Sequence, residues 1–168
     1  MAAVDKSQYE IFEVESNHKD PNKRRVVDIS QGVVAFTYFE NIMSPTLTAR
    51  AIIVNTGGGV SDDEGNMIGV YNGLPFRGGE RVIIKIKSNS NNNQDLDFSQ
   101  DTTKYFFVSS VSDVMVEAQK EIFTLNLISK EAITNETVRV GKKFPVSQKI
   151  SDSVEAVSYT HLRAHETV

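Results

Sequence analysis

Histidine and cysteine set the limits on the chemistry of this chain. Its 168 residues contain three histidines and no cysteine, which excludes disulfides, thiolate metal sites and a cysteine nucleophile. His161 and His165 are four positions apart, a spacing that can hold a metal ion on one face of a helix. His18 lies in a polar stretch, and no serine, histidine and aspartate triad can be assembled around it. We therefore predict no catalytic residue and no metal ligand among the histidines.

The last eleven residues differ in character from the rest of the chain. Residues 158–168, SYTHLRAHETV, resemble the translated read-through of a sequencing-library adapter at the end of a gene fragment. Both His161 and His165 fall within them, so we interpret their spacing as accidental. The alternative is a native helical tail, because Leu162 continues the helical spacing of Val154 and Val157. Under the first interpretation the native protein is cut short after residue 157.

Acidic side chains gather in one turn that faintly suggests a calcium loop. Calcium requires several oxygen ligands that converge on one turn, but the spacing here is not that of an EF-hand, and no bidentate glutamate follows. The side chains concerned are Asp62, Asp63, Glu64 and Asn66. A plain acidic turn is the favoured interpretation, and no cofactor or metal is predicted.

Two glycine clusters and several carboxylates complete the search for chemistry. Residues 57–59 and 77–79 lack the lysine and hydroxyl residues of a phosphate-binding loop, and no helix follows them, so we predict turns. Asp95, Asp97 and Asp101 do not single out a pair for glycoside hydrolysis. The chain is accordingly predicted not to be an enzyme.

Composition bounds the class of protein. The chain is 39% hydrophobic and 24% charged, values close to globular averages, and no apolar run approaches the roughly 18 to 20 residues that cross a bilayer. The first ten residues lack the apolar core of a secretory signal, so synthesis in a cytoplasm is expected. The net charge of −4, with both signs mixed along the chain, supplies no basic patch for phosphates, and nucleic acid is an unexpected partner.

Alternating apolar residues predict a mainly β fold with one or two helices, in one domain over residues 1–157. The expected hairpins join 26–41 to 47–54 and 105–117 to 121–128. In the first of these strands Val34, Phe36 and Tyr38 should share one face, and in the last strand Phe123, Leu125 and Leu127 should face the core. Further strands are expected at 9–14 and 80–88, where Val82, Ile84 and Ile86 point inward.

The remaining segments are predicted as loops or helices. Residues 16–25, 56–79 and 89–103 are rich in turn-forming residues and are expected to be irregular, the last of them mobile. Ser129 can cap a helix over 130–138 that ends at Gly141. A second helix is expected to begin near residues 147–151.

Three stretches of the sequence resemble a known family. They are VVDISQGVVAFTYFENIMSPTLTARAIIVNTGG, NGLPFRGGERVIIKI, and YFFVSSVSDV followed by IFTLNLISKEAITNETVRVGKKF. They follow one another as a hairpin, a glycine-rich stretch that ends in GGE before a strand, and a serine before a helix. This order resembles that of the baseplate hub proteins of T-even-like contractile-tailed bacteriophages. The match covers Val26 to Val157, and its motifs are structural rather than catalytic.

The resemblance implies a fold, an assembly and partners. The fold implied is a β-barrel of the phage tail-tube type, here the N-terminal barrel of a hub protein whose C-terminal half is missing. In that family a trimer places six barrels in a ring that joins the tail tube protein to the central spike protein. A virion location in the tail baseplate follows, after assembly in the host cytoplasm, with no membrane insertion.

Two other functions remain as alternatives. A stand-alone receptor- or carbohydrate-binding β-domain would need exposed aromatic residues on loops, for which Tyr71 and Phe76 are the candidates. A tail-associated cell-wall hydrolase is suggested only by the location that the family implies.

Overall fold

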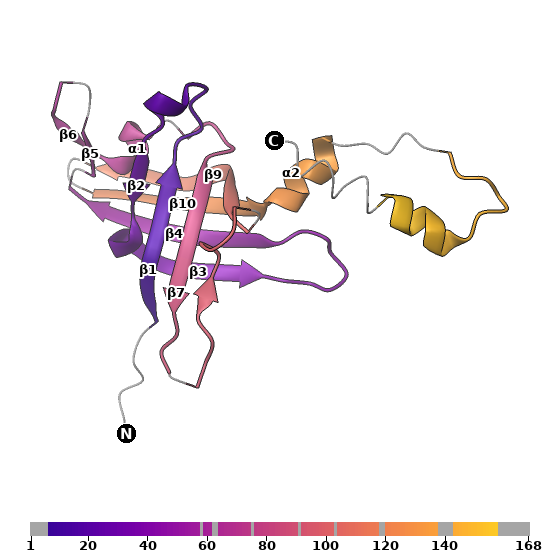
Figure 1. The fold of residues 1–168 in the computed structure, drawn as a ribbon. Helices are drawn as coiled ribbons and strands as arrows, with labels where there is room; N and C mark the ends of the chain where they lie inside the picture. Colours follow the sequence, from indigo (N-terminus) through magenta and orange to yellow (C-terminus); the bar gives the residue numbers. More distant parts are fainter. Residues whose placement is uncertain are drawn as a thin grey trace. The chain divides into compact units, whose positions relative to one another are not determined.

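The computed structural model of the chain describes residues 7–57, 59–61, 64–74, 76–90, 92–102, 104–117, 120–137 and 143–157. The chain forms two compact units, Met1–Ala132 and Ile133–Val168. The first unit holds all the described strands and the second holds helical segments, so the fold is mainly β with antiparallel sheets, as predicted (Figure 1). Residues 158–168, including His161 and His165, lie outside the described residues.

One antiparallel sheet makes up most of the first unit. Its strands follow the order β2-β1-β7-β9-β10-β4-β3, with β8 paired to β7, and a second sheet pairs β5 with β6. The strands are β1 (Gln8–Glu15), β2 (Val26–Asp28), β3 (Val33–Phe39), β4 (Thr48–Thr56), β5 (Val60–Ser61), β6 (Met67–Ile68), β7 (Arg81–Lys87), β8 (Leu96–Asp97), β9 (Phe106–Glu117) and β10 (Lys120–Ser129). Both predicted hairpins are confirmed as β3–β4 and β9–β10.

The sheet turns a corner between β7 and β9. These strands pair only at Arg81 with Phe107 and at Val82 with Phe106, and β1 and β7 then run across β3, β4, β9 and β10 (Figure 1). The two layers enclose the core between them. Within the described residues no ladder joins β3 to β1 or β2, so the sheet does not close into a fully hydrogen-bonded barrel.

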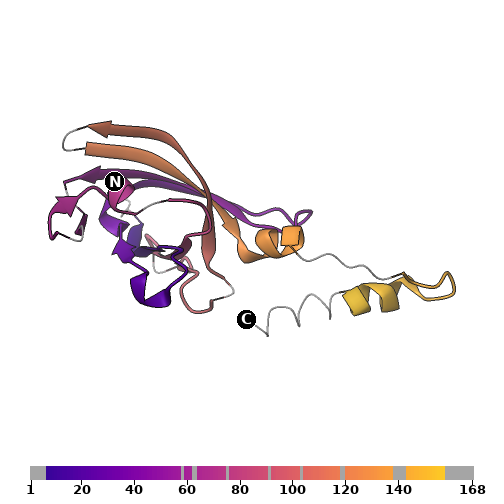
Figure 2. The ribbon, with the colours of Figure 1, turned by 90° about the horizontal axis from the view of Figure 1, so that it is seen from above.

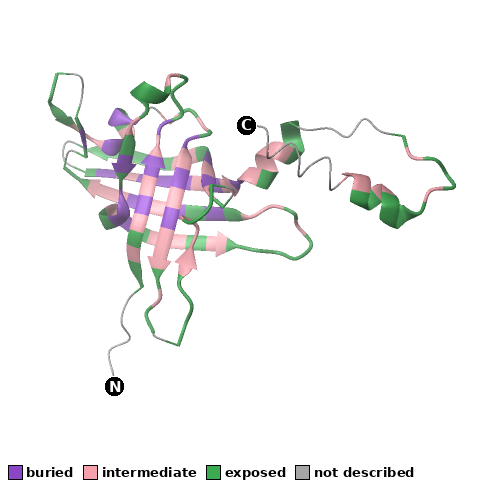
Figure 3. Cartoon of the chain, viewed as in Figure 1, coloured by how far each residue is buried: buried purple, intermediate pink, exposed green. Residues whose placement is uncertain are grey.

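Alternating burial along the strands confirms the predicted inward faces. Apolar side chains at every second position meet across the two layers and lose contact with water, which is the main favourable term in folding. Figure 3 shows the resulting bands of buried residues on β1 and β7. Of the predicted inward residues, Val82, Ile84, Phe123, Leu125 and Leu127 are buried, and Ile86 is partly buried against the core.

The expected single strand over residues 26–41 is wrong. It divides into β2 and β3 around a 3-10 turn at Ser30–Gly32, where the Asp28 carboxylate accepts a hydrogen bond from the Ser30 N–H at 2.8 Å. A register shift at the start of β3 then places an extra residue in that strand. As a result Val34 is 64% exposed, while Phe36 and Tyr38 pack against the core; the prediction that all three share one face fails at Val34.

Two segments expected to be irregular contain regular structure. Residues 89–103 include β8, and the neighbouring Phe98 N–H donates to the Ile84 carbonyl at 2.9 Å. The Phe98 ring lies edge-on against Phe106, with 5.1 Å between ring centroids. Residues 56–79 contain the β5–β6 hairpin and the short helix α1 (Val70–Gly73). The 3-10 turn Pro21–Lys23 within the predicted loop 16–25 is capped by Asp20.

The predicted helix after β10 is confirmed as α2 (Lys130–Thr137), but its cap is not. The Ser129 hydroxyl accepts a hydrogen bond from the Leu47 N–H at 3.1 Å, so it ties β10 to the segment before β4. Residues 150–157 are helical, as expected for the second helix, and the predicted stop at Gly141 lies outside the described residues. No helix among the described residues is long and apolar enough to span a membrane.

Candidate functional site

The residues singled out for metal chemistry do not form a cluster where the structure describes them. The His18 Nδ1 accepts a hydrogen bond from the Asp20 N–H at 3.1 Å, which places it in a local turn. The described residues contain no group of three or more histidine, aspartate or glutamate side chains that could hold a metal ion. Asp62 and Asp63 lie outside the described residues, so the predicted acidic turn is seen only in part.

The turn at residues 77–79 is built by a buried carboxylate. Gly78 and Gly79 have φ values of 88° and 85°, a left-handed conformation that suits glycine. Glu80 is 1% exposed, and it accepts hydrogen bonds from the backbone N–H groups of Arg77 at 2.6 Å and Gly78 at 3.1 Å. The Gly79 N–H donates to the Val108 carbonyl. All three backbone donors are therefore used within the protein, and none is left to cradle a phosphate.

The aromatic pair considered for carbohydrate binding packs onto the core. The Tyr71 and Phe76 rings stack at 6.2 Å between centroids with 27° between their planes. Each also lies against the buried Phe123, at 5.8 Å and 5.7 Å. Both side chains are only partly exposed. Their faces are thus engaged with one another and with the core rather than displayed on a loop.

The carboxylates considered for hydrolysis serve local turns. Asp97 accepts hydrogen bonds from the Ser99 hydroxyl at 2.6 Å and the Gln100 amide at 3.1 Å. The Ser99 bonds, followed by that of Gln100, lower the pKa of the Asp97 carboxyl. Asp95 accepts from the Ser88 N–H at 2.8 Å. The lowered pKa of Asp97 is the opposite of the raised pKa that a general acid for glycoside hydrolysis requires.

The most distinctive backbone feature is the outer part of β9. Because the ladder between β7 and β9 ends at Phe107, residues 109–117 pair with β10 on one side, and within the described residues no ladder forms on the other. The turn end of the β9–β10 hairpin extends beyond β7 in Figure 1, and Figure 2 shows β9 and β10 curving together. We call residues 109–117 the β9 edge. An edge of this kind presents unpaired N–H and C=O groups that can template another strand.

Apolar side chains line this edge. Val114, Met115 and Val116 are consecutive and all exposed, so both faces of the strand carry apolar surface there. Just before them, Asp113 has a φ of 53° and its carboxylate meets the Arg50 guanidinium at 2.8 Å. The ladder with β10 shifts register at the same point, so the strand bends where its exposed part begins.

A second uncovered edge lies at the far side of the same layer. β3 is the terminal strand of the sheet order. The Phe36 backbone hydrogen-bonds to the Tyr9 hydroxyl. Burial raises the pKa of that hydroxyl, and the bond to Phe36 offsets only part of the rise. The turn that follows β3 displays Ile42 and Met43, which are 99% and 87% exposed. We call the outer side of β3, residues 33–39, the β3 edge.

Loops that are distant in the sequence form a basic hollow of about 720 Å³. Arg24 is held there by Glu15 at 3.3 Å, and the Asn17 amide donates to the Gly78 carbonyl at 2.6 Å. The hollow is lined by Ser16, Asn17, His18, Asn22, Lys23, Arg24, Arg25, Asn72, Gly73, Arg77 and Glu80. The mixed charge along the chain predicted no basic patch, and the fold corrects that expectation locally.

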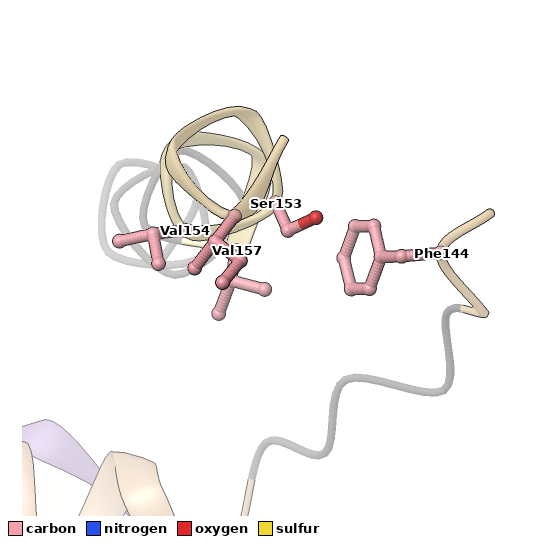
Figure 4. A pocket seen from close by; sticks show the side chains of 5 residues that line it. Phe144, Ser153, Val154 and Val157 are labelled. Carbon is pink, nitrogen blue, oxygen red and sulfur yellow. The ribbon is translucent and has the colours of Figure 1, made fainter. Parts of the chain in front are cut away.

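The second unit contains a small apolar hollow. The Phe144 ring faces the helix of residues 150–157, where Ser153, Val154 and Val157 complete the lining with Ile150 (Figure 4). Its volume is about 290 Å³, and Ile150 and Val154 remain exposed. No polar group converges on this hollow apart from the Ser153 hydroxyl, so its lining offers little specific recognition.

Comparisons of the chain with protein-family models, with curated proteins and with solved structures gave no match.

Proposed function

We propose that this chain is a structural subunit of a phage tail baseplate hub, which assembles with copies of itself through the β9 edge and the β3 edge. The proposal rests on one observation: residues 109–117 form a long strand edge that has no ladder partner and carries exposed apolar side chains. Monomeric proteins usually protect such edges with charge, proline, a β-bulge or a covering element; here the register shift at Asp113 leaves the apolar residues 114–116 beyond it.

The two edges suit one another in direction. Every ladder in the layer β9-β10-β4-β3 is antiparallel, so β3 runs opposite to β9. If the β9 edge of one copy meets the β3 edge of the next, the junction is antiparallel too, and the sheet continues from copy to copy. A head-to-tail contact of this kind forms a ring where the rotation closes.

Apolar surface at both edges supports the same contact. The exposed Val116 on one side and Phe39 on the other would be covered by a neighbouring copy, which gains stability from burial. The Tyr9 hydroxyl occupies one backbone group of the β3 edge, so a partner strand would pair beyond it, toward Phe39.

The family resemblance gives this assembly its place. In baseplate hub proteins a trimer sets six barrels in a ring between the tail tube protein and the central spike protein, and the motifs over Val26–Val157 resemble theirs. We accordingly propose a homo-oligomer in the virion baseplate, assembled in the host cytoplasm. Neither of the alternative functions has an observation in its favour, because Tyr71 and Phe76 are packed and no catalytic arrangement is found among the described residues.

Engineered cysteines provide the test, since the chain has none of its own. A chain carrying both Thr37→Cys and Val116→Cys should form covalent oligomers on mild oxidation, because both positions are exposed on the proposed junction. Val116→Cys alone should stay monomeric under denaturing electrophoresis. A matched control combines Thr37→Cys with Met67→Cys, which is exposed but lies on β6, and should not form oligomers.

Two outcomes would count against this arrangement. Covalent dimers from Val116→Cys alone would indicate a symmetric β9-to-β9 contact in place of the head-to-tail one. A constant monomer mass in light scattering of the full chain up to millimolar concentration would contradict the assembly function itself.

A further inference from the structure

We propose that the basic hollow binds a hydroxylated phosphate ester, of which a sugar phosphate is the simplest example. This inference is independent of the assembly function, because the hollow is formed by residues outside the β9 and β3 edges. It rests on three features: two cations that make no ion pair with the described residues, walls fixed by internal hydrogen bonds, and a lining that contains amides but, among the described residues, no aliphatic side chain.

The cations supply the charge that a phosphate would neutralise. Lys23, Arg24, Arg25 and Arg77 are cationic, and the one carboxylate in the lining, Glu80, is already bound by backbone N–H groups. The Arg77 guanidinium and the Lys23 ammonium make no ion pair with the described residues. Two such groups at one hollow favour a dianion, and the arginine fork can hold two phosphate oxygens together.

The walls are fixed before any ligand arrives. Glu80 and Asn17 hold the turn at residues 77–79 through three hydrogen bonds. On the facing loop the Ser16 hydroxyl accepts from the Arg25 N–H at 2.9 Å. A site whose backbone is ordered in advance loses less conformational entropy on binding.

The lining also indicates what the rest of the ligand contains. The side-chain amides of Asn22 and Asn72 line the hollow, and each offers donors and an acceptor that match hydroxyl groups. Among the described residues the lining includes no aliphatic side chain and no ring other than that of His18, so a nucleobase or an acyl chain would find few side chains to pack against. A volume of about 720 Å³ lies within the range of small-molecule sites.

Because the backbone donors of residues 77–79 are occupied, recognition has to come from side chains. The neutralising substitutions Lys23→Gln and Arg77→Gln should therefore each weaken binding about tenfold. Lys87→Gln, on β7 and outside the lining, is the matched control and should leave binding unchanged.

Titration calorimetry of the full chain with glucose 6-phosphate, glucose and inorganic phosphate tests the proposal. We expect glucose 6-phosphate to bind, inorganic phosphate to bind at least tenfold more weakly, and glucose not to bind. A phosphomannan oligosaccharide distinguishes a free ester from one carried on a glycan, and binding of either supports the shared chemistry.

Several results would overturn it. Equal binding of inorganic phosphate and glucose 6-phosphate would show that the amides of Asn22 and Asn72 do not bind the sugar hydroxyls. Binding that survives both Lys23→Gln and Arg77→Gln would place the ligand elsewhere, and absence of heat with every phosphate ester at millimolar concentration would exclude the site. Binding of a polyglutamate peptide in place of the esters would assign the hollow to an acidic protein partner.

Discussion

The two ends of β9 share one ladder with β10 and yet differ completely in their surroundings. At the corner, Phe106 and Val108 are buried beneath β7. Beyond it, Val114, Met115 and Val116 are exposed although their backbone pairing with β10 continues. The difference arises because β7 pairs with β9 at only two residues and then crosses the layer.

This contrast separates two contributions to strand structure. Backbone pairing alone forms the outer hairpin, whereas burial of side chains requires the second layer, which covers only the inner part. Apolar residues in the outer part are thus not explained by the core of this chain. The proposed contact with another copy would cover them.

The largest expected effect is the difference in stability between a substitution at the buried end of β9 and one at its exposed end. Phe106→Ala should lower the free energy of unfolding by about 3–5 kcal/mol, because it removes a fully buried ring that contacts Phe98 and Tyr38. Met115→Ala should change it by less than about 0.5 kcal/mol, because that side chain is exposed. Urea denaturation at micromolar concentration measures both, and comparable losses would show that the outer part is packed within the single chain.

The next largest effect concerns a carboxylate that is buried in the outer part of the hairpin. Glu121 on β10 accepts hydrogen bonds from the Asn55 amide at 3.1 Å and the Tyr71 N–H at 3.3 Å. Glu121→Ala removes the acceptor of the Tyr71 N–H and leaves the Asn55 amide only its bond to the Gly57 carbonyl, and should cost about 1–3 kcal/mol. Glu117→Ala, at an exposed position of the same hairpin, serves as the control and should be neutral in the same denaturation experiment. Equal losses of stability from the two substitutions would mean that Glu121 contributes no more than an exposed side chain of the same hairpin.

Sequence alone predicted much of the inner region because its pattern is local. The period-two spacing of Phe123, Leu125 and Leu127 requires only that one face of the strand be apolar, and the structure buries all three. Val34 broke that rule, since a register shift between Val33 and Ala35 depends on how β3 pairs with β4. No residue type in the stretch marks such a shift.

The candidate sites could not be found in the same way. The basic hollow joins the loop 16–25 with residues 72–80. The run Lys23, Arg24 and Arg25 is visible in the sequence, but the fold alone places Arg77 beside it. The β9 edge looked like an ordinary amphipathic strand, because its exposure follows from the departure of β7 rather than from its own residues. The only local signal was the run of three apolar residues, Val114, Met115 and Val116, which interrupts alternation.

A smaller effect tests the corner itself. Gly78 has a φ of 88°, and a Cβ there would approach its nearest neighbours, the Val108 and Ser109 carbonyls, no closer than 3.8 Å. Gly78→Ala therefore adds backbone strain without a clash, and should destabilise the chain by about 1–2 kcal/mol. Thermal denaturation followed by circular dichroism measures the loss. An unchanged midpoint would mean that the backbone at Gly78 can adopt another conformation without loss of stability.

The smallest effect lies at the point where β9 bends toward its exposed end. Hydrogen bonds from Thr124 and Ser112, with the Arg50 charge, lower the pKa of the Asp113 carboxyl below its ordinary value of 3.8. A carboxyl with a lowered folded-state pKa stabilises the protein above its unfolded pKa, and this contribution disappears as pH falls through the folded value. The Asp113→Asn chain should thus be less stable than the parent chain at pH 7. As the pH falls below about 4, it should lose less stability than the parent chain. Urea midpoints across that range measure the difference, and parallel pH profiles for the two chains would show that the bend does not depend on this charge.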